Sequence, residues 1–102
     1  MIARVWRGWT SQQDADAYER FLREQMFPSI HRVDGFLGAE LLRHDAGDEV
    51  AFMTITRFDS LEAVREFAGD DYERAVIEPE ARRLLARHDE RSEHFDVAIG
   101  DG

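Results

Sequence analysis

The run Glu49 to Phe58, EVAFMTITRF, constrains the fold of this chain most strongly. β-Branched and aromatic side chains fill it, and it holds neither glycine nor proline, so it predicts a β-strand. The segment before it, residues 45–48, is short and polar with one glycine, which is typical of a hairpin loop. A second strand-forming run, residues 36–44, precedes that loop and follows the turn signal Asp34-Gly35. The pattern therefore predicts an antiparallel hairpin in the middle of the chain.

On the N-terminal side of this hairpin the hydrophobic period changes. Residues 2–9, IARVWRGW, predict a first strand. After Asp14, which with Ser11 is a candidate cap, the spacing becomes that of an amphipathic helix. Pro28 lies inside this pattern, so the helix should kink or restart near Met26-Phe27. The residues that recur at steps of three and four are Tyr18, Phe21, Leu22, Gln25, Met26 and Ile30.

A short helix is predicted directly after the hairpin, with Leu61, Val64 and Phe67 on its apolar side. Asp59 together with Glu62 resembles a capping box at its start. Gly69 should end this helix, because glycine readily adopts the left-handed conformation that closes many helices.

The last third of the chain predicts more helix and one more strand. Residues 70–77 repeat the cap pattern, which predicts another helical turn through Ile77. Pro79 suits the first turn of a further helix that carries Leu84 and Leu85 inward. Residues 91–99 predict the final strand.

The resulting order, β-α-β-β-α-(α)-β, is that of the ferredoxin-like split βαβ fold. It predicts an α+β domain with a four-stranded antiparallel sheet and helices on one face. The chain has 102 residues, which suits a single domain spanning residues 1–102. We find no internal repeat, linker or low-complexity segment.

Both faces of the predicted sheet carry large apolar side chains. Because successive strand residues point to opposite faces, Phe52 and Phe58 share one face while Met53 and Ile55 share the other. A sheet covered by helices on one side only should be polar on its free side. An apolar free face predicts a partner subunit, and we expect a homodimer.

Composition excludes several classes of function. The chain has 13 basic and 22 acidic residues and a net charge of −9, which opposes binding to nucleic acid or to an anionic membrane. It has no cysteine and no lysine, so disulfides, thiolate catalysis and Schiff-base chemistry through a protein amine are excluded. No segment predicts a signal peptide or a membrane span, and we expect a cytoplasmic protein.

The order of elements resembles the antibiotic biosynthesis monooxygenase family, whose members form dimeric α+β barrels. The resemblance covers nearly the whole chain, and its sharpest part is residues 51–63, AFMTITRFDSLEA. There a strand ends in an aromatic residue, an acidic residue and a serine follow, and a short helix begins.

The resemblance implies a pocket between helices and sheet for a flat hydrophobic molecule. Some members oxidise polycyclic aromatic substrates with molecular oxygen and no cofactor; the substrate becomes a carbanion, and the protein supplies desolvation, positioning and proton handling. Other members bind and degrade haem, using an asparagine on the first strand and a histidine at the position matching Val76. This chain has no asparagine, and phenylalanine stands at positions 58 and 67, where the family often has tryptophan or histidine.

Three residues are candidates for catalysis. Tyr72 follows a helix break beside the expected pocket mouth, where its phenol can relay a proton; the alternative is a core tyrosine. His94 shares a face of the last strand with Asp96, as a base with an orienting carboxylate or as an exposed polar pair. Arg57 is one of three strand arginines, with Arg4 and Arg7. It is a candidate for holding a substrate oxyanion, and the alternative is an ion pair.

Six further residues are candidates for binding a substrate, and each has an alternative role in packing. One of the two tryptophans on the first strand can line an aromatic pocket, and His31 follows the kinked end of the first helix. No pair of histidines has a metal-ligand spacing, and we expect neither metal nor cofactor. The candidate substrate-binding residues are Trp6, Trp9, His31, Phe52, Phe58 and Phe67.

These observations predict a cofactor-independent monooxygenase that acts on an aromatic or polyketide-like small molecule. The alternative is a non-catalytic dimer that binds a hydrophobic small molecule in the same pocket. Haem binding without the usual degrading residues is a third reading.

Overall fold

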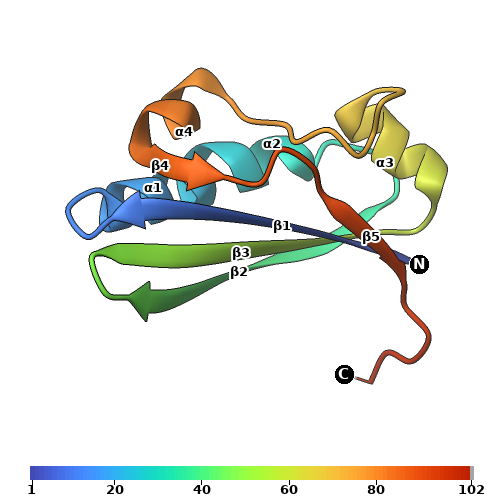
Figure 1. Cartoon of the computed structure of the whole chain (residues 1–102). Helices are drawn as coiled ribbons and strands as arrows, with labels where there is room; N and C mark the ends of the chain where they lie inside the picture. Colours follow the sequence, from blue (N-terminus) through green and yellow to red (C-terminus); the bar gives the residue numbers. More distant parts are fainter. Residues whose placement is uncertain (102) are drawn as a thin grey trace.

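One antiparallel sheet forms the base of the molecule, and the helices cover one of its two faces (Figure 1). The computed structural model describes residues 1–101. The strand order is β2-β3-β1-β4, and β5 also pairs with β1. The strands are β1 (Ile2–Ser11), β2 (Phe36–Ala46), β3 (Glu49–Phe58), β4 (Leu85–His88) and β5 (Glu93–Asp96). The predicted α+β, ferredoxin-like architecture is confirmed.

The sheet has five strands rather than four, because two short strands share one edge of β1. β5 pairs with the first half of β1 and β4 with its second half. The predicted last strand, 91–99, is therefore shorter than expected. Leu85 begins β4 instead of extending a helix, because the open edge of β1 supplies backbone partners that helix propensity does not outweigh.

The first long helix is continuous but changes its winding. It comprises α1 (Ala15–Phe21), a π-helical segment η1 (Leu22–Met26) and α2 (Phe27–Ile30). The amide of Phe27 donates to Leu22, five residues earlier, and Pro28 occupies the first turn of α2. Proline has no amide hydrogen and clashes with the carbonyl four residues before it, so a wider turn accommodates it. The predicted restart at Met26-Phe27 is confirmed.

The segment after α3 (Leu61–Ala68) is not the helical turn that we predicted for residues 70–77. It makes one turn, in which the amide of Arg74 donates to Asp71, and then runs extended into α4 (Pro79–Leu84). A residue before proline disfavours helical backbone, and Glu78 has ψ 153°. Hydrogen bonds from Ala75 to Glu90 and from Ser92 to Glu73 tie this segment to the chain that follows β4.

The caps of the helices also differ in part from the prediction. Ser60, not Asp59, caps α3, since its hydroxyl accepts the amide of Ala63 at 3.2 Å. Gly69 ends α3 with φ 87°, as predicted. Asp14 precedes α1 without a side-chain cap, and the Ser11 hydroxyl accepts its amide.

Two hydrophobic clusters hold the helices on the sheet. At one end, Tyr18 packs edge-on against Phe52 with ring centroids 4.9 Å apart. At the other end, beneath α3, Ile30 and Val64 pack around Phe58, which is fully buried. Between the two clusters β3 carries the small side chains of Thr54 and Thr56, and a cavity lies over this part of the sheet.

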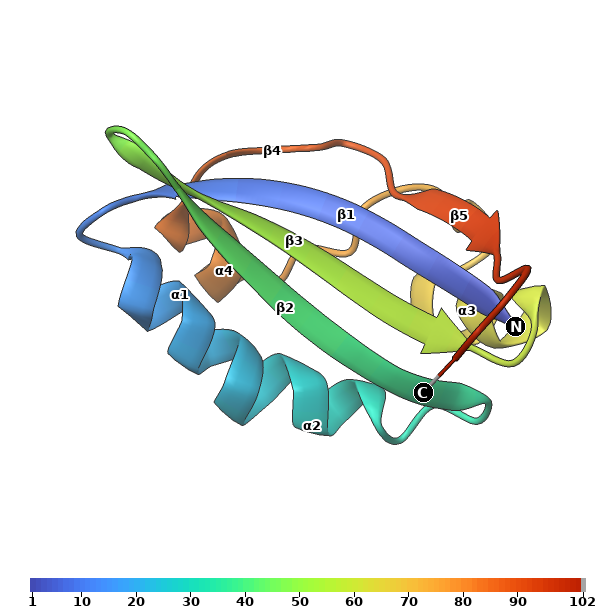
Figure 2. The same ribbon diagram turned by 90° about the horizontal axis from the view of Figure 1, so that it is seen from below.

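The opposite face of the sheet is open (Figure 2). It presents Val5, Trp9, Met53 and Ile55, which are half-buried among their neighbours. The chain after β5 leaves the plane of the sheet on this side and crosses it (Figures 1 and 2). No helix among residues 1–101 is long and apolar enough to cross a membrane.

Candidate functional site

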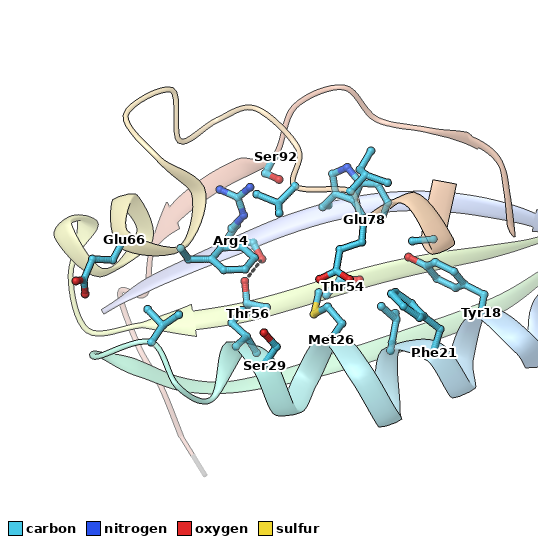
Figure 3. Close-up of a pocket in the computed structure, with 18 residues that line it drawn as sticks. Arg4, Tyr18, Phe21, Met26, Ser29, Thr54, Thr56, Glu66, Glu78 and Ser92 are labelled. Carbon is cyan, nitrogen blue, oxygen red and sulfur yellow. Dashed lines mark hydrogen bonds between the residues drawn. The ribbon is translucent and has the colours of Figure 1, made fainter. Parts of the chain in front are cut away.

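A cavity of about 340 Å³ lies between the covered face of the sheet and the helices (Figure 3). β1 and β3 form its floor, the first long helix forms one wall, and α3 with the segment leading into α4 closes the rest. Its lining side chains are Arg4, Trp6, Tyr18, Phe21, Leu22, Met26, Ser29, Ile30, Val33, Thr54, Thr56, Glu66, Phe67, Val76, Ile77, Glu78, Ala81 and Ser92.

The middle of the cavity is apolar and aromatic. Phe21 and Met26 enter the cavity from the first long helix (Figure 3). Ile77, on the extended segment, also lines it. Trp6 is held in place because its indole N–H donates to the carbonyl of Asp89 at 2.8 Å. A fixed indole and flexible thioether and alkyl groups suit a flat hydrophobic ligand.

One end of the cavity holds a buried cation. Arg4 is only 4% exposed, and its guanidinium donates to the carbonyls of Tyr72 and Arg74 and contacts His94. No carboxylate of residues 1–101 forms an ion pair with it. Burial lowers the pKa of Arg4 to about 10, because the charged form loses hydration. The cation thus rests on two backbone carbonyls and a neutral imidazole.

The contact with Arg4 determines the protonation of His94. Nε2 lies 3.0 Å from the Arg4 guanidinium, which only donates, so Nε2 must accept and the proton lies on Nδ1. Nδ1 is buried without a partner among the described residues. Burial, and then the charge of Arg4, hold the pKa of His94 below its ordinary value. His94 is therefore a neutral acceptor that supports Arg4.

Ser92 and two threonines add hydroxyl groups to the lining of the cavity. Ser92 is 4% exposed, lines the cavity beside Arg4, and its hydroxyl has no partner within residues 1–101 (Figure 3). Thr56 donates to the carbonyl of Arg4 at 3.5 Å, and Thr54 lies further along β3. A buried hydroxyl without a partner costs free energy unless a ligand supplies one.

Two more polar groups enter the cavity away from Arg4. The hydroxyl of Tyr18 points into it from the other end, and Glu78 points down toward Thr54 and Met26 (Figure 3). Burial raises the pKa of Tyr18, so this phenol stays protonated and can donate a hydrogen bond. Glu78 precedes α4 and makes no side-chain cap, which leaves its carboxylate directed to the cavity.

The structure places some of the predicted site residues at the cavity and others away from it. Trp6 and Phe67 line it, and Phe52 and Phe58 lie in the two clusters that flank it. Trp9 is on the open face, between Arg7 and Arg87. His31 is exposed and packs edge-on against Phe36 at 4.9 Å.

The three predicted catalytic residues are not brought together. Tyr72 and His94 are neighbours, with ring centroids 5.1 Å apart, and both reach the cavity only through Arg4. Arg57 is on the open face, where it pairs with Glu40 at 2.7 Å. None of the three lines the cavity. Their catalytic roles stay predictions.

Sequence reasoning did not single out Ser92, Glu78 or Tyr18, and it chose Arg57 over Arg4. One signal was available for Arg4, because alternation along β1 places it on the same face as Trp6. No signal was available for Ser92 and Glu78, because they follow irregular segments that only tertiary contacts position. Among residues 1–101, no three histidine or acidic side chains form a group able to hold a metal ion.

Solved structures with this fold include enzymes. The haem degrader MhuD of Mycobacterium tuberculosis superposes with a TM-score of 0.62, at 20% identity, over 100% of both chains. A variant of SnoaB, a cofactor-independent oxygenase of Streptomyces nogalater, superposes with a TM-score of 0.62 at 21% identity, over 97% of this chain and 94% of the SnoaB chain. The Streptomyces coelicolor monooxygenase ActVA-Orf6, bound to nanaomycin D, superposes with a TM-score of 0.59 at 16% identity, over 99% of this chain and 92% of the ActVA-Orf6 chain.

A comparison with curated proteins finds no match. The profile of one family does match, and it covers residues 1–79, from the first strand through the cavity wall to the start of α4. This stretch includes the hairpin and the strand-to-helix junction that carried the resemblance. The chain therefore belongs to the antibiotic biosynthesis monooxygenase family.

Proposed function

We propose that this protein is a cytoplasmic, homodimeric, cofactor-independent monooxygenase that oxidises an aromatic or polyketide-like small molecule. The observation that carries the proposal is the cavity of about 340 Å³ on the covered face of the sheet. Its size is at the lower end of the range, roughly 300–1,000 Å³, that small-molecule sites occupy. Family membership and the fold shared with SnoaB and ActVA-Orf6 support the same reading.

The proposed reaction uses the substrate as its own electron source. An activated ring methylene, R₂CH₂, loses a proton to a base and becomes a carbanion. The carbanion passes an electron to O₂, the two radicals combine, and the resulting hydroperoxide loses water. The sum, R₂CH₂ + O₂ → R₂C=O + H₂O, balances atoms and electrons without a cofactor.

Glu78 is the residue we assign as the base. Its carboxylate enters the cavity beside the apolar middle, where the flat part of a ligand would lie (Figure 3). Tyr18 is suited to hydrogen-bond a carbonyl oxygen of the ligand from the far end. Trp6 and Phe21 would position the rings and exclude water, which favours proton transfer and protects the carbanion.

Haem fits this cavity poorly as a cofactor. Val76 lines it at the position where the resemblance to haem degraders implies a histidine, and a valine side chain cannot ligate iron. His94 does not line the cavity, and its Nε2 is held against Arg4. We therefore derive no step through haem.

Oxygen uptake tests the function. The protein, incubated aerobically with anthrone, should consume oxygen and form anthraquinone in equal amounts. The Glu78→Gln variant, which keeps the shape of the side chain, should lower kcat about 100-fold or more while KM changes little. Ligands that bind without any oxygen uptake would instead identify a non-catalytic binding protein.

The open face supports a homodimer. It exposes Leu42 and Phe95, 46% and 49% exposed, beside the half-buried Val5, Met53 and Ile55. An apolar surface of this kind on a sheet is rare in a monomer. Light scattering should give twice the mass of the chain, and a stable monomer at micromolar concentration would contradict the proposal.

A further inference from the structure

We propose that the Arg4 end of the cavity is a subsite for an anionic oxygen group carried at one end of an aromatic ligand. The group is a carboxylate or an ionised ring hydroxyl, held by Arg4 and Ser92. This inference rests on the proposed function and narrows its substrate class from aromatic molecules to aromatic anions. It assigns the recognition of charge to residues separate from Glu78, the proposed base.

Arg4 has no carboxylate counter-charge among residues 1–101. Buried guanidinium groups are normally paired, because an uncompensated charge in a desolvated site is costly. Every ion pair among residues 1–101 involves another arginine: Arg7, Arg23, Arg43, Arg57, Arg87 or Arg91. All six are far more exposed than Arg4. Within residues 1–101, the most deeply buried cation thus has no carboxylate partner, although the chain carries 22 acidic residues.

Arg4 also has N–H donors that no described residue accepts. A guanidinium has five N–H groups. Contacts with the Tyr72 carbonyl and His94 use both on Nη1, and the Arg74 carbonyl uses one on Nη2. Nε–H and one Nη2–H have no partner among the described residues. Arg4 also lines the cavity, so these donors are available to a ligand oxygen there.

Ser92 provides a second, independent donor at the same place. Its side chain lies beside Arg4 at the cavity wall (Figure 3), and its hydroxyl is buried and unpaired within the part of the chain that the structure describes. Native proteins rarely leave such a hydroxyl without a partner. One anionic oxygen group would satisfy Ser92 and neutralise Arg4 together, as charge-assisted hydrogen bonds do in binding sites.

The neighbouring titratable groups are compatible with this subsite. His94 is neutral, because protonation would place a second cation 3.0 Å from Arg4. Glu66 and Glu78 line the cavity but form no ion pair with Arg4. Phe67 covers the guanidinium with its ring, whose centroid is 5.5 Å from Cζ. The cation is therefore oriented and partly desolvated before any ligand arrives.

Fluorescence titration with three matched probes tests the proposal. These are anthracene-2-carboxylate, its neutral counterpart 2-(hydroxymethyl)anthracene, and 2-hydroxyanthracene. At pH 7.5 the carboxylate should bind about 10- to 100-fold more tightly than the alcohol. If the hydroxyl probe binds as its anion, its spectrum should shift to that of the anthrolate. This arm distinguishes a ring hydroxyl from a carboxylate as the group recognised.

Variants assign the preference to residues. Arg4→Gln should abolish the preference for the carboxylate and leave the affinity for the alcohol within about threefold. Ser92→Ala is a small change that removes the hydroxyl. It should weaken binding of the carboxylate probe about three- to tenfold and leave binding of the alcohol probe unchanged. Arg82→Gln removes an equal charge from the exposed side of α4 and should change neither.

Each outcome decides the proposal. Equal affinity for the carboxylate and the alcohol in the native protein, or a preference that survives both Arg4→Gln and Ser92→Ala, would overturn it. If Arg4→Gln does not fold, the native comparison and Ser92→Ala suffice. The proposed oxygenase function is tested separately. A preference for the carboxylate with no oxygen uptake would support the subsite and contradict the oxygenase function. Oxygen uptake without the preference would support the oxygenase function and contradict the subsite.

Discussion

The two faces of the sheet have nearly the same composition but different surroundings. Along β3, Phe52 and Phe58 point to the helices and are buried, whereas Met53 and Ile55 point to the open side and are half-buried. Both pairs are large and apolar. The difference shows that apolar strand residues mark a surface to be covered, but they do not say whether the cover belongs to the same chain.

The arginines show the same contrast. Arg4 and Arg57 lie on adjacent strands, on opposite faces. Arg57 has a carboxylate partner, Glu40, and both side chains are in contact with water, with exposures of 34% and 58%. Arg4 is buried and rests on two carbonyls and an imidazole. Solvation, more than residue type, therefore separates a surface ion pair from a candidate ligand site.

The largest effect should come from removing a covered aromatic ring. Phe58→Ala should lower the free energy of unfolding by about 3–5 kcal/mol, because it leaves a cavity beneath α3. Met53→Ala, on the open face, should cost about 1 kcal/mol within one subunit. Urea denaturation followed by tryptophan fluorescence measures both. If a second copy covers the open face, the loss of unfolding free energy in Met53→Ala will depend on protein concentration. Equal losses in Phe58→Ala and Met53→Ala, independent of concentration, would contradict the distinction between the two faces.

A charge placed on the open face tests what covers it. Ile55→Arg should dissociate the proposed dimer, weakening it by roughly 100-fold or more, since an unpaired charge in a desolvated interface costs about 3 kcal/mol or more. Light scattering over a dilution series measures this. Gln25→Arg, on the exposed side of η1, adds the same charge and should leave the mass unchanged. An unaltered dimer in Ile55→Arg would show that another surface mediates assembly.

Removing each arginine should have unequal consequences for stability. Arg4→Ala leaves the carbonyls of Tyr72 and Arg74 without their donor and should cost about 1–3 kcal/mol. Arg57→Ala removes an exposed ion pair and should cost less than about 1 kcal/mol. Hydrogen exchange should show faster opening of residues 72–75 in the first variant alone. Similar costs, with no local opening, would remove Arg4 as the anchor of this loop.

The smallest effect should be a pH dependence due to His94. Its pKa is lowered in the folded state, so the unfolded chain takes up the proton first as the pH falls below the ordinary histidine value of 6.5. Stability is therefore complete above that pH and declines below it, down to the folded-state pKa. His94→Phe keeps the ring against Tyr72 and should flatten this decline between pH 7 and 5. Parallel curves for the two proteins would contradict the lowered pKa of His94 in the folded state.

Most of the long elements were predictable because local pattern and tertiary structure agree in them. β3 alternates between faces over its whole length, and the first helix keeps its apolar spacing through Pro28. The segment from 70 to 99 was harder. Glu93–Asp96 lies within the final strand predicted for residues 91–99. The cap-like pairs and leucines before it suit helix, yet the free edge of β1 draws Leu85–His88 into the sheet. Non-local backbone pairing outweighed local preference there.

The candidate site was predictable only in its aromatic part. Trp6 and Phe67 line the cavity because strand alternation and helix period place them on the covered side. Arg57 was preferred over Arg4, although alternation along β1 places Arg4 on the same face as Trp6, because the residue pattern does not say which arginine is buried. The two arginines differ in burial and in their partners. The carbonyls that hold Arg4 belong to Tyr72 and Arg74, which lie 68 and 70 positions further along the chain.

The residue pattern alone thus accounts for the fold class, the order of the long elements, the apolar character of both sheet faces and the resemblance to the family. These properties follow from side-chain periodicity and turn chemistry, which act between near neighbours. Only the tertiary structure shows which face of the sheet the helices cover and where the cavity opens. It also shows that Arg57 has a carboxylate partner, whereas Arg4 has none among the described residues. Desolvation and hydrogen bonding depend on what surrounds a group, and those surroundings come from distant parts of the chain.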